Sequence, residues 1–258
     1  MRIWHMSGAG NDFAVMDARD GSWDFVALSR QLCAELGADG FLALDSSETA
    51  DFRLHFYNSD GLRGEMCGNG ARCICKFAYD LGIAGAAMTV ETDAGLVYGW
   101  RLAADQYRVQ LNVPDVIDLQ RKPGVAYVEL GCPGIPHVLQ EIPGLSWDMR
   151  EKLRQQAKFL RYDPAFPKGT NVTFYTMLDN STVRVLTYER GVEDYTLACG
   201  TGCGSLAAVL WSQGKLPGRV LTAHNPGGTL KLTVTGQARI VKKLLLEGPA
   251  EVLKIFEI

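Results

Sequence analysis

Two cysteines of this sequence each precede a glycine-rich turn. Cys67 lies in "EMCGNGARC" (65–73), and Cys199 lies in "LACGTGCGS" (197–205). A cysteine followed by Gly-x-Gly at a helix start lies beside backbone N–H groups without helical partners and at the positive end of the helix dipole. This position is expected to lower the thiol pKa, and its N–H groups can bind a carboxylate or phosphate. One such turn is a weak signal, because a metal ligand, a disulfide or a small buried cysteine fits it too.

Two thiols on opposite faces of a bound amino acid could invert its α-carbon. One cysteine, as the thiolate, would remove the proton from Cα, and the other, as the thiol, would protonate the opposite face. N–H groups at the two helix starts would stabilise the negative charge that develops on the carboxylate. This chemistry requires neither pyridoxal nor a metal, so we expect no cofactor and no metal ion.

The two cysteine turns belong to an internal repeat. The spacing is the same in both halves: 15 residues from Cys67 to Gly82 and from Cys199 to Gly214, and 28 residues from these cysteines to Gly95 and Gly227. Each half reads strand, loop, Cys-Gly-x-Gly, helix, strand, tight turn, strand. Two such copies that meet about a pseudo-twofold axis would place the two cysteine turns face to face.

The elements that must position these turns predict a strand-rich α+β chain. Alternating or β-branched stretches predict strands at 12–18, 52–61, 87–95, 181–191 and 229–234. Amphipathic patterns predict helices at 23–37 and 146–161, and two more begin directly after the cysteines. No βαβ rhythm and no Rossmann signature is present. The loop around 111–116 is the predicted boundary between an N-terminal lobe, 1–113, and a C-terminal lobe, 114–249.

Composition narrows the class of protein. The 258 residues are 47% hydrophobic and 21% charged, with a net charge of −3 and a pI near 5.8, as in ordinary globular proteins. Scattered basic residues argue against a nucleic-acid partner. The N-terminus has no signal-like apolar region and no stretch predicts a membrane span, so we expect a cytoplasmic protein without a membrane partner.

The cysteine count also disfavours two other readings. Seven cysteines, an odd number in a chain without a signal peptide, do not predict a disulfide framework. A zinc or iron–sulfur site is disfavoured because the spacings are not paired Cys-x2-Cys units and no histidine is interleaved. Three cysteines inside the predicted helices are interpreted as small buried residues: Cys73, Cys75 and Cys203.

The sequence resembles the diaminopimelate epimerase family almost from end to end. The resemblance is carried by "SGAGNDFAVMDA" (7–18), "FYNSDGLRGEMCGNGARC" (56–73), "GIPHV" (134–138), "GTNVTF" (169–174), "YERGVEDYTLACGTG" (188–202) and "NPGGTLKL" (225–232). It implies a pyridoxal-independent epimerase that interconverts LL- and meso-diaminopimelate in bacterial lysine and peptidoglycan synthesis. It also implies a homodimer, two lobes that are each a barrel-like sheet around a central helix, and a C-terminal strand, 250–258, that returns to the first lobe.

The resemblance assigns roles to individual residues. Cys67 and Cys199 match the acid–base pair, and His137 and Glu189 match residues that assist proton exchange at the thiols. The N–H groups that match the carboxylate cradle belong to Gly68, Asn69, Gly200 and Thr201. The residues that match the rest of the substrate site are Asn11, Asn58, Asn171, Glu189 and Arg190.

One position departs from many family members. Ile135 stands before Pro136 and His137, where many members have an asparagine that helps hold the distal end of diaminopimelate. This departure leaves room for an epimerase or racemase of another amino acid, such as histidine, aspartate or a hydroxyproline. A remote alternative is a metal-binding protein with the cysteines as ligands.

Overall fold

The computed structural model describes residues 1–64 and 66–257 as two compact units. Unit 1 comprises Met1–Gln110 and Glu247–Ile258, and unit 2 comprises Leu111–Leu246. Glu65, within the first cysteine motif, and Ile258, at the end of the predicted strand 250–258, lie outside the described residues. The predicted boundaries of the two lobes, after residues 113 and 249, stay a prediction.

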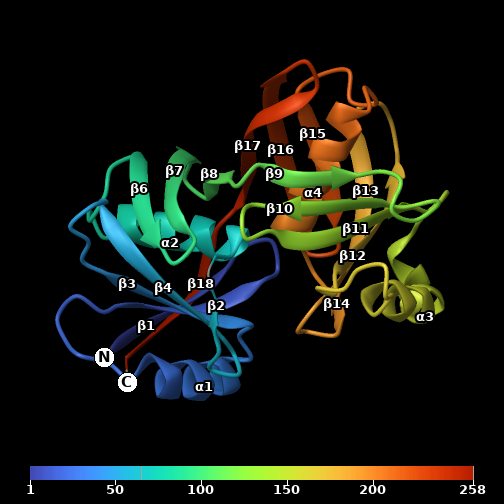
Figure 1. Cartoon of the computed structure of the whole chain (residues 1–258). Helices are drawn as coiled ribbons and strands as arrows, with labels where there is room; N and C mark the ends of the chain where they lie inside the picture. The colour runs from blue at the N-terminus through green and yellow to red at the C-terminus, as the bar shows by residue number, and fades with distance from the viewer. Residues whose placement is uncertain (65, 258) are drawn as a thin grey trace. The chain divides into compact units, whose positions relative to one another are not determined.

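Unit 1 is a sheet around one central helix, α2 (Figure 1). Its elements in chain order are β1 (Arg2–Ser7), β2 (Asp12–Asp17), α1 (Phe25–Leu36), β3 (Gly40–Asp45), β4 (Phe52–Asn58), β5 (Arg63–Gly64), α2 (Gly68–Asp80), β6 (Ala87–Thr92), β7 (Gly95–Ala103), β8 (Gln106–Leu111) and β18 (Glu251–Glu257). Helix α2 contacts β1, β2, β3 and β7, and it is buried from its first residue to Ala78. Helix α1 packs on β2, β3 and β4.

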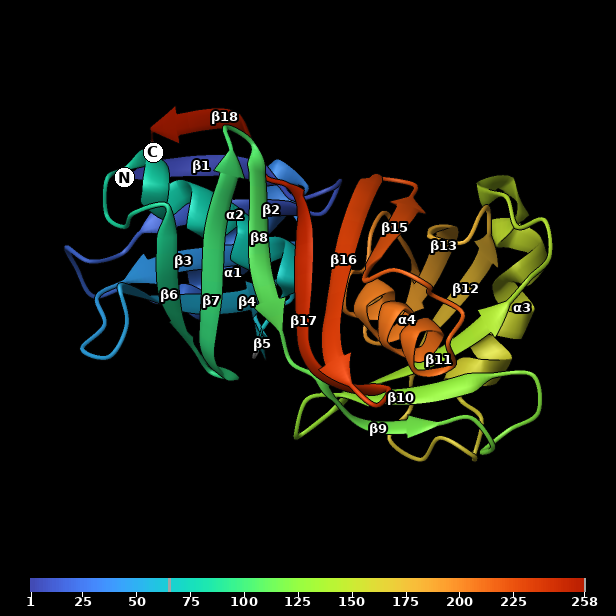
Figure 2. The same ribbon diagram turned by 90° about the horizontal axis from the view of Figure 1, so that it is seen from above.

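Unit 2 repeats this plan around α4 (Figure 2). Its elements are β9 (Pro114–Asp118), β10 (Ala126–Leu130), β11 (Ile135–Glu141), the 3-10 helix η1 (Trp147–Met149), α3 (Arg150–Arg161), β12 (Asn171–Met177), β13 (Thr182–Glu189), β14 (Asp194–Thr196), α4 (Gly200–Ser212), β15 (Val220–Asn225) and β16 (Gly228–Gln237). Strand β17 (Ile240–Pro249) begins in this unit and ends in unit 1. Helix α4 contacts β9 to β12, β15 and β16.

Both units follow the same strand pairing. In unit 1, β1–β2 is antiparallel, β2–β3 parallel, β3–β4 antiparallel, β4–β6 parallel and β6–β7 antiparallel. Unit 2 repeats this series in β10–β11, β11–β12, β12–β13, β13–β15 and β15–β16. A further antiparallel strand joins the first strand of each unit, β18 on β1 and β9 on β10. The predicted α+β class with two duplicated, sheet-rich lobes is confirmed.

The helices begin and end where the sequence indicates. The Asp24 side chain accepts a hydrogen bond from the N–H of Ala27 and caps α1, and Gly37 closes that helix with φ of 66°, in the left-handed region. This conformation favours glycine because other residues carry a Cβ that crowds the backbone. The predicted helix 146–161 forms as η1 followed directly by α3.

The last hairpin of the second repeat differs from the spacing given above. Gly95 closes the β6–β7 turn opposite Thr92. In the β15–β16 turn the equivalent residue is Gly228, opposite Asn225, rather than Gly227. The second repeat therefore has one extra residue between its cysteine and this turn (228 − 199 = 29, against 95 − 67 = 28).

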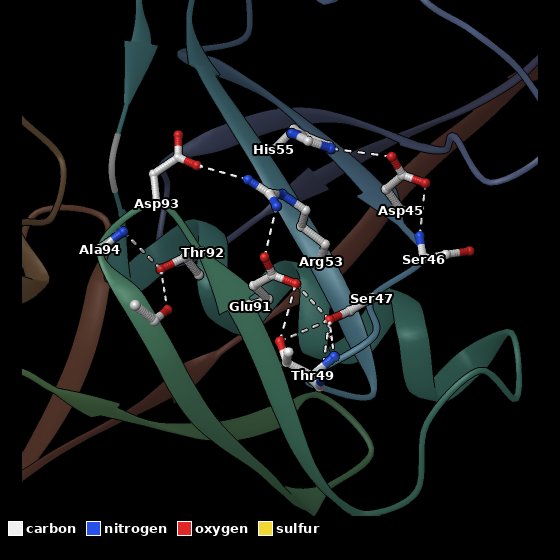
Figure 3. Close-up of polar contacts among 12 residues, drawn as sticks. Asp45, Ser46, Ser47, Thr49, Arg53, His55, Glu91, Thr92, Asp93 and Ala94 are labelled. Atoms are coloured by element: carbon white, nitrogen blue, oxygen red, sulfur yellow. Dashed lines mark hydrogen bonds and ion pairs between the residues drawn. The ribbon is translucent and has the colours of Figure 1, made fainter.

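An ion-pair cluster holds the parallel junction between β4 and β6 (Figure 3). Arg53, which pairs with Glu91 in the strand register, donates to the Glu91 carboxylate at 2.7 Å. Ser47 donates to the other oxygen of that carboxylate at 2.6 Å, and the second Arg53 nitrogen reaches Asp93 at 3.3 Å. Because the cluster joins partners in register, we interpret it as a structural contact that fixes how β4 and β6 align.

Candidate active site

Cys67 is the N-cap residue of α2. Its backbone is extended, with φ of −128° and ψ of 123°, and its sulfur accepts a hydrogen bond from the N–H of Gly70 at 3.5 Å. The first hydrogen bond of the helix ladder runs from Ala71 N–H to the Cys67 carbonyl at 2.7 Å. The N–H groups of Gly68 and Asn69 precede that bond, so they lie at the helix N-terminus, as the carboxylate cradle requires.

Asn11 connects the loop before β2 to the first cysteine. Its Oδ1 lies 3.7 Å from Cys67 Sγ and accepts a hydrogen bond from Asn69 Nδ2 at 3.3 Å. Its Nδ2 donates to Asp39 Oδ2 at 2.6 Å, and the N–H of Asp12 donates to the same oxygen at 2.9 Å. A carboxylate only accepts hydrogen bonds. Asp39 therefore fixes the Asn11 amide with its nitrogen toward the carboxylate and its oxygen toward Cys67.

Asp39 was not identified from the sequence. It stands directly before β3, next to Gly40, and its side chain reaches across to the start of the neighbouring β2. The available signal was an acidic residue placed just before a buried strand, which is weak because such residues are common in turns.

Asn58 is the last residue of β4, at the same edge of unit 1. It pairs with Gly40, and Gly40 pairs with Phe13 of β2, two residues beyond Asn11. The Asn58 side chain donates to the carbonyl of Leu62 at 3.2 Å and holds the turn that leads to β5. The predicted substrate residue thus has a turn-forming role in unit 1 as well.

Cys199 is the N-cap residue of α4 and is 5% exposed. Its sulfur lies 3.5 Å from the hydroxyl oxygen of Thr201. Burial raises the pKa of Cys199 well above its usual range and the charge of Glu189 raises it further, while hydrogen bonds from Thr201 and the N–H of Gly202 lower it. The expectation that the helix start gives a lowered pKa is wrong for Cys199, because burial outweighs the two donors.

His137 is fully buried in β11 beside this cysteine. Its Nε2 lies 3.1 Å from the Thr201 hydroxyl, and its Nδ1 has no hydrogen-bond partner among the described residues. Burial, followed by the charge of Arg190, lowers the pKa of His137 to about 3. The imidazole is therefore neutral at physiological pH. It can donate or accept a hydrogen bond, and it does not supply a positive charge.

Asn171 and Arg190 meet at the same edge of unit 2. Asn171 pairs with His137 across β11 and β12, and its Oδ1 accepts from the N–H of Arg190 at 2.9 Å. The Arg190 guanidinium donates to the carbonyl of Lys168 at 2.9 Å. Glu189, the last residue of β13, accepts a hydrogen bond from the Thr196 hydroxyl. The start of β12 and the ends of β13 and β14 thus converge on the start of α4.

The structure gathers the predicted residues into two half-sites, one in each unit. Unit 1 brings together Cys67, Gly68, Asn69 and Asn11, with Asn58 at the same sheet edge. Unit 2 brings together Cys199, Gly200, Thr201, His137, Asn171, Glu189 and Arg190. Catalytic and binding roles for these residues stay predictions.

The other cysteines of the motifs are core residues. Cys73, Cys75 and Cys203 are fully buried in the two central helices, and burial raises the pKa of both Cys73 and Cys75 to about 12. Within residues 1–64 and 66–257, no group of three or more His, Cys, Asp or Glu side chains is arranged to hold a metal ion. None of the helices in that part of the chain has the length and hydropathy needed to cross a bilayer.

Solved structures share this fold at low sequence identity. A phenazine biosynthesis protein of the PhzF family from Bacillus anthracis superposes with a TM-score of 0.77 at 15% identity, over 100% of this chain and 98% of that chain. A probable proline racemase from Agrobacterium radiobacter gives 0.75 at 16% identity, over 100% of this chain and 92% of that chain. The duplicated fold is therefore that of these proteins.

Curated relatives match at higher identity. The chain is 35% identical to a diaminopimelate epimerase of Aquifex aeolicus, covering 100% of this chain and 96% of the relative, and 33% identical to one of Chlorobaculum tepidum, covering 95% and 96%. These relatives place the chain among the isomerases that act as amino acid epimerases. The model of the diaminopimelate epimerase family matches residues 3–112 and 133–252. The chain belongs to the diaminopimelate epimerase family.

Proposed function

We propose that this chain is a diaminopimelate epimerase that interconverts LL- and meso-diaminopimelate, with Cys67 and Cys199 as the acid–base pair. The observation that carries the proposal is the repeated placement of a cysteine at the N-cap of a buried central helix, in a chain of this family. The Cys67 sulfur accepts a hydrogen bond from the N–H of Gly70 at 3.5 Å, and the N–H of Gly202, three residues after Cys199, lowers the pKa of that thiol. The two repeats therefore supply two thiols at equivalent positions, as inversion by two bases requires.

The proposed reaction moves one proton at each face of the α-carbon. The thiolate of one cysteine forms an S–H bond with the α-proton as the Cα–H bond breaks, and the electron pair is delocalised into the carboxylate. The other thiol then gives its proton to the opposite face and becomes the thiolate. The N–H groups proposed to stabilise the carboxylate are those of Gly68, Asn69, Gly200 and Thr201. In the reverse direction the cysteines exchange roles, and no cofactor or metal enters either step.

The remaining half-site residues are proposed to bind the rest of the substrate. Arg190 is suited to the second carboxylate of diaminopimelate, because a guanidinium can hold a carboxylate through two parallel hydrogen bonds. Asn11 and Asn171 have amide groups whose orientation is fixed by hydrogen bonds to Asp39 and to the backbone. Asn58 and Glu189 complete the proposed set. Glu189 and His137 are also proposed to assist proton exchange at the thiols.

Ile135 favours a second candidate on the same fold and chemistry. It begins β11, two residues before His137, so strand alternation places both side chains on one face. An aliphatic side chain offers no hydrogen bond to a polar distal group. An epimerase of an amino acid such as histidine, aspartate or a hydroxyproline would fit this position without an asparagine.

Deuterium exchange at Cα distinguishes the two candidates. The purified chain is incubated in heavy water with LL- and meso-diaminopimelate and with a panel of single amino acids, and label at Cα is measured by mass spectrometry. We expect label only in the diaminopimelate isomers, together with interconversion. Label in histidine or another single amino acid, with none in diaminopimelate, would replace the first candidate by the second.

A homodimer, a cytoplasmic location and a role in lysine and peptidoglycan synthesis complete the proposal. Exposed apolar side chains on β18 support a contact with a second copy: Val252 is 37% exposed, Leu253 50% and Ile255 51%. Light scattering tests this directly. A monomeric mass at working concentration, unchanged in a variant with Leu253→Lys, would contradict the dimer.

A further inference from the structure

The repeat makes it possible to compare what lies behind each cysteine. The hairpins after the central helices close at equivalent residues, Gly95 and Gly228. Val90 and Ala223 are therefore equivalent residues of these hairpins. Val90 pairs with Phe52 and Ala223 pairs with Val183, so Phe52 and Val183 are equivalent as well. Continuing through the neighbouring strands gives three pairs of equivalent positions behind the cysteines: Phe56 and Thr187, Leu42 and Thr173, Phe13 and His137.

The side chains at the three positions behind Cys67 are apolar. A Cβ placed on Gly70 would lie 3.1 Å from a Leu42 methyl group and 3.5 Å from the ring of Phe13. Phe13 packs edge to face on Phe56, with ring centroids 6.4 Å apart. Leu42 and Phe13 are buried core residues. This set shows that the fold accepts hydrocarbon at all three positions.

The side chains at the three equivalent positions behind Cys199 are polar. A Cβ placed on Gly202 would lie 2.8 Å from Thr173 Oγ1, 3.4 Å from Thr187 Oγ1 and 3.4 Å from Cys199 Sγ, so the three atoms converge beside this glycine. The two hydroxyl oxygens are 3.2 Å apart, and His137 is joined through Thr201 to the sulfur. Thr173, Thr187 and His137 are each at most 2% exposed.

Such a polar cluster is costly to the fold. Burying hydroxyl and imidazole groups loses their hydration, and a buried group with no partner among the described residues, such as His137 Nδ1, costs more than an apolar side chain in its place. Since the first repeat has Phe13, Leu42 and Phe56 at the equivalent positions, packing does not require polar residues here. Their presence behind only the second cysteine points to its chemistry.

We propose that Thr201 is a positioning residue that, with His137 and the Thr173–Thr187 hydroxyl pair behind it, lets the buried Cys199 exchange between thiol and thiolate; this rests on the proposed two-cysteine function. A hydroxyl has one donor and two acceptor sites, so it can donate to the thiolate and accept from the thiol by rotating one bond. We place the His137 proton on Nε2, where it donates to Thr201 in both states, because a buried N–H without an acceptor is rare.

The charged groups around Cys199 make this adjustable donor necessary. Glu189 raises the pKa of Cys199, as does the neighbouring thiol of Cys203, and both add to the effect of burial. Burial, and after it the charge of Arg190, lowers the pKa of His137 and keeps the imidazole neutral, so His137 supplies no cation to the thiolate. The groups that favour the thiolate are the Thr201 hydroxyl and the Gly202 N–H.

The test measures the Cys199 thiol without substrate. Thiolate ultraviolet absorbance is titrated with pH in the full chain, and the titration of the same protein with Cys199→Ser is subtracted. Thr201→Val removes the hydroxyl and keeps the shape and the N–H group, whereas Thr201→Ser restores the hydroxyl. The matched control is Thr176→Val, a buried threonine of β12 on the opposite strand face from Thr173.

We expect Thr201→Val to raise the midpoint of the Cys199 titration by about one pH unit or more, equivalent to about a tenfold loss of thiolate at a given pH. Thr201→Ser and Thr176→Val should titrate like the parent. With substrate, Thr201→Val should lower kcat by roughly tenfold with little change in KM. Equal titration of the Val variant, the Ser variant and the parent would overturn the inference even if the parent is an active epimerase. An inactive parent whose Cys199 titration still shifts in Thr201→Val would refute the proposed function instead.

Discussion

At the scale of single residues, the two cysteines have different surroundings although the same motif introduces them. Cys67 is half-buried beside a fixed amide oxygen, and Cys199 is buried beside a hydroxyl. The sequence was sufficient to predict that both cysteines lie at helix starts, because Cys-Gly-x-Gly before a helix is a local pattern. It could not identify Asp39, Thr173 or Thr187, because each acts through partners that only strand pairing brings near.

The pKa of His137 leads to a prediction about stability. The folded pKa, about 3, lies below the usual value of 6.5, so between these values the unfolded chain binds more protons than the folded chain. Stability must therefore fall as pH falls through this window and is unaffected near neutrality. The loss should reach about 2 kcal/mol by about pH 5. Urea unfolding of the parent and of His137→Gln should show this loss in the parent alone.

The control for this prediction is His224→Gln. His224 lies on β15 and contacts Thr229, outside the buried cluster, so this variant shows whether a change in the pH dependence of stability belongs to the buried histidine. A parent protein that is equally stable at about pH 7 and pH 5 would show that His137 is protonated in the fold or that it is already neutral when unfolded.

Gly202 tests how closely the thiol and the hydroxyl pair are packed. Alanine improves helix propensity by about 1 kcal/mol, but its Cβ would lie 2.8 Å from the buried Thr173 oxygen. We expect Gly202→Ala to cost about 1–3 kcal/mol in the free energy of unfolding and to lower kcat. Gly218→Ala is the comparison, because a Cβ there meets nothing within 4 Å. Equal stability of both variants in urea would contradict the close packing.

At the scale of elements, the central helices position the two cysteines that are proposed to act on the substrate. Helices α2 and α4 each begin directly after a cysteine and are buried along most of their length, so strand contacts fix their N-termini. The sequence predicted these helix starts well, because capping and glycine signals are local. The strand order was not available from those signals, since two parallel junctions, β4–β6 and β13–β15, depend on long-range pairing.

Serine variants separate helix capping from catalysis. Serine is a preferred N-cap residue, so Cys67→Ser and Cys199→Ser should change the free energy of unfolding by less than about 1 kcal/mol. Each should slow epimerisation by about a thousandfold or more, because a hydroxyl is a far weaker acid than a thiol and the barrier rises by several kcal/mol. Thermal unfolding and turnover are measured on the same samples.

Two outcomes would argue against the two-base scheme. One is near-parental turnover in either serine variant. The other is a large loss of stability in a variant that has lost activity, since the defect would then lie in the helix and not in the chemistry. Cys75→Ser, a change within buried α2, is the informative contrast: it should reduce stability without removing an acid–base group.

At the scale of the whole molecule, duplication determines the organisation of the chain. The same pairing series appears twice, and each series is completed by a further strand on its first strand, β9 directly before β10 in unit 2 and a strand distant in the chain in unit 1. In unit 1 that strand is β18, which comes from the C-terminus and pairs with β1 from Arg2 to Ser7. Counting residues could detect the repeat, but it gave Gly227 for Gly228, because a one-residue insertion in a loop leaves no mark in composition.

Removal of residues 250–258 tests whether β18 stabilises unit 1 alone. The buried side chains Ile3 and Met6 lie on β1, so losing its antiparallel partner exposes backbone groups beside core residues. The hydrogen bond from Arg72 to the carbonyl of Pro249 is kept in this truncation. We expect amide exchange in α2 to become roughly a hundredfold faster, with α4 changed by less than about threefold.

Hydrogen-exchange mass spectrometry resolves the two helices as separate peptides, so each serves as the reference for the other. Ile255→Thr, which keeps β18 and its β propensity, should leave both helices protected. Equal loss of protection in α2 and α4 after truncation would mean that the two units unfold together, and the repeats would then form one cooperative structure. Loss confined to α2 would mean that each cysteine is positioned by the stability of its own unit, so that the two half-sites can be weakened one at a time.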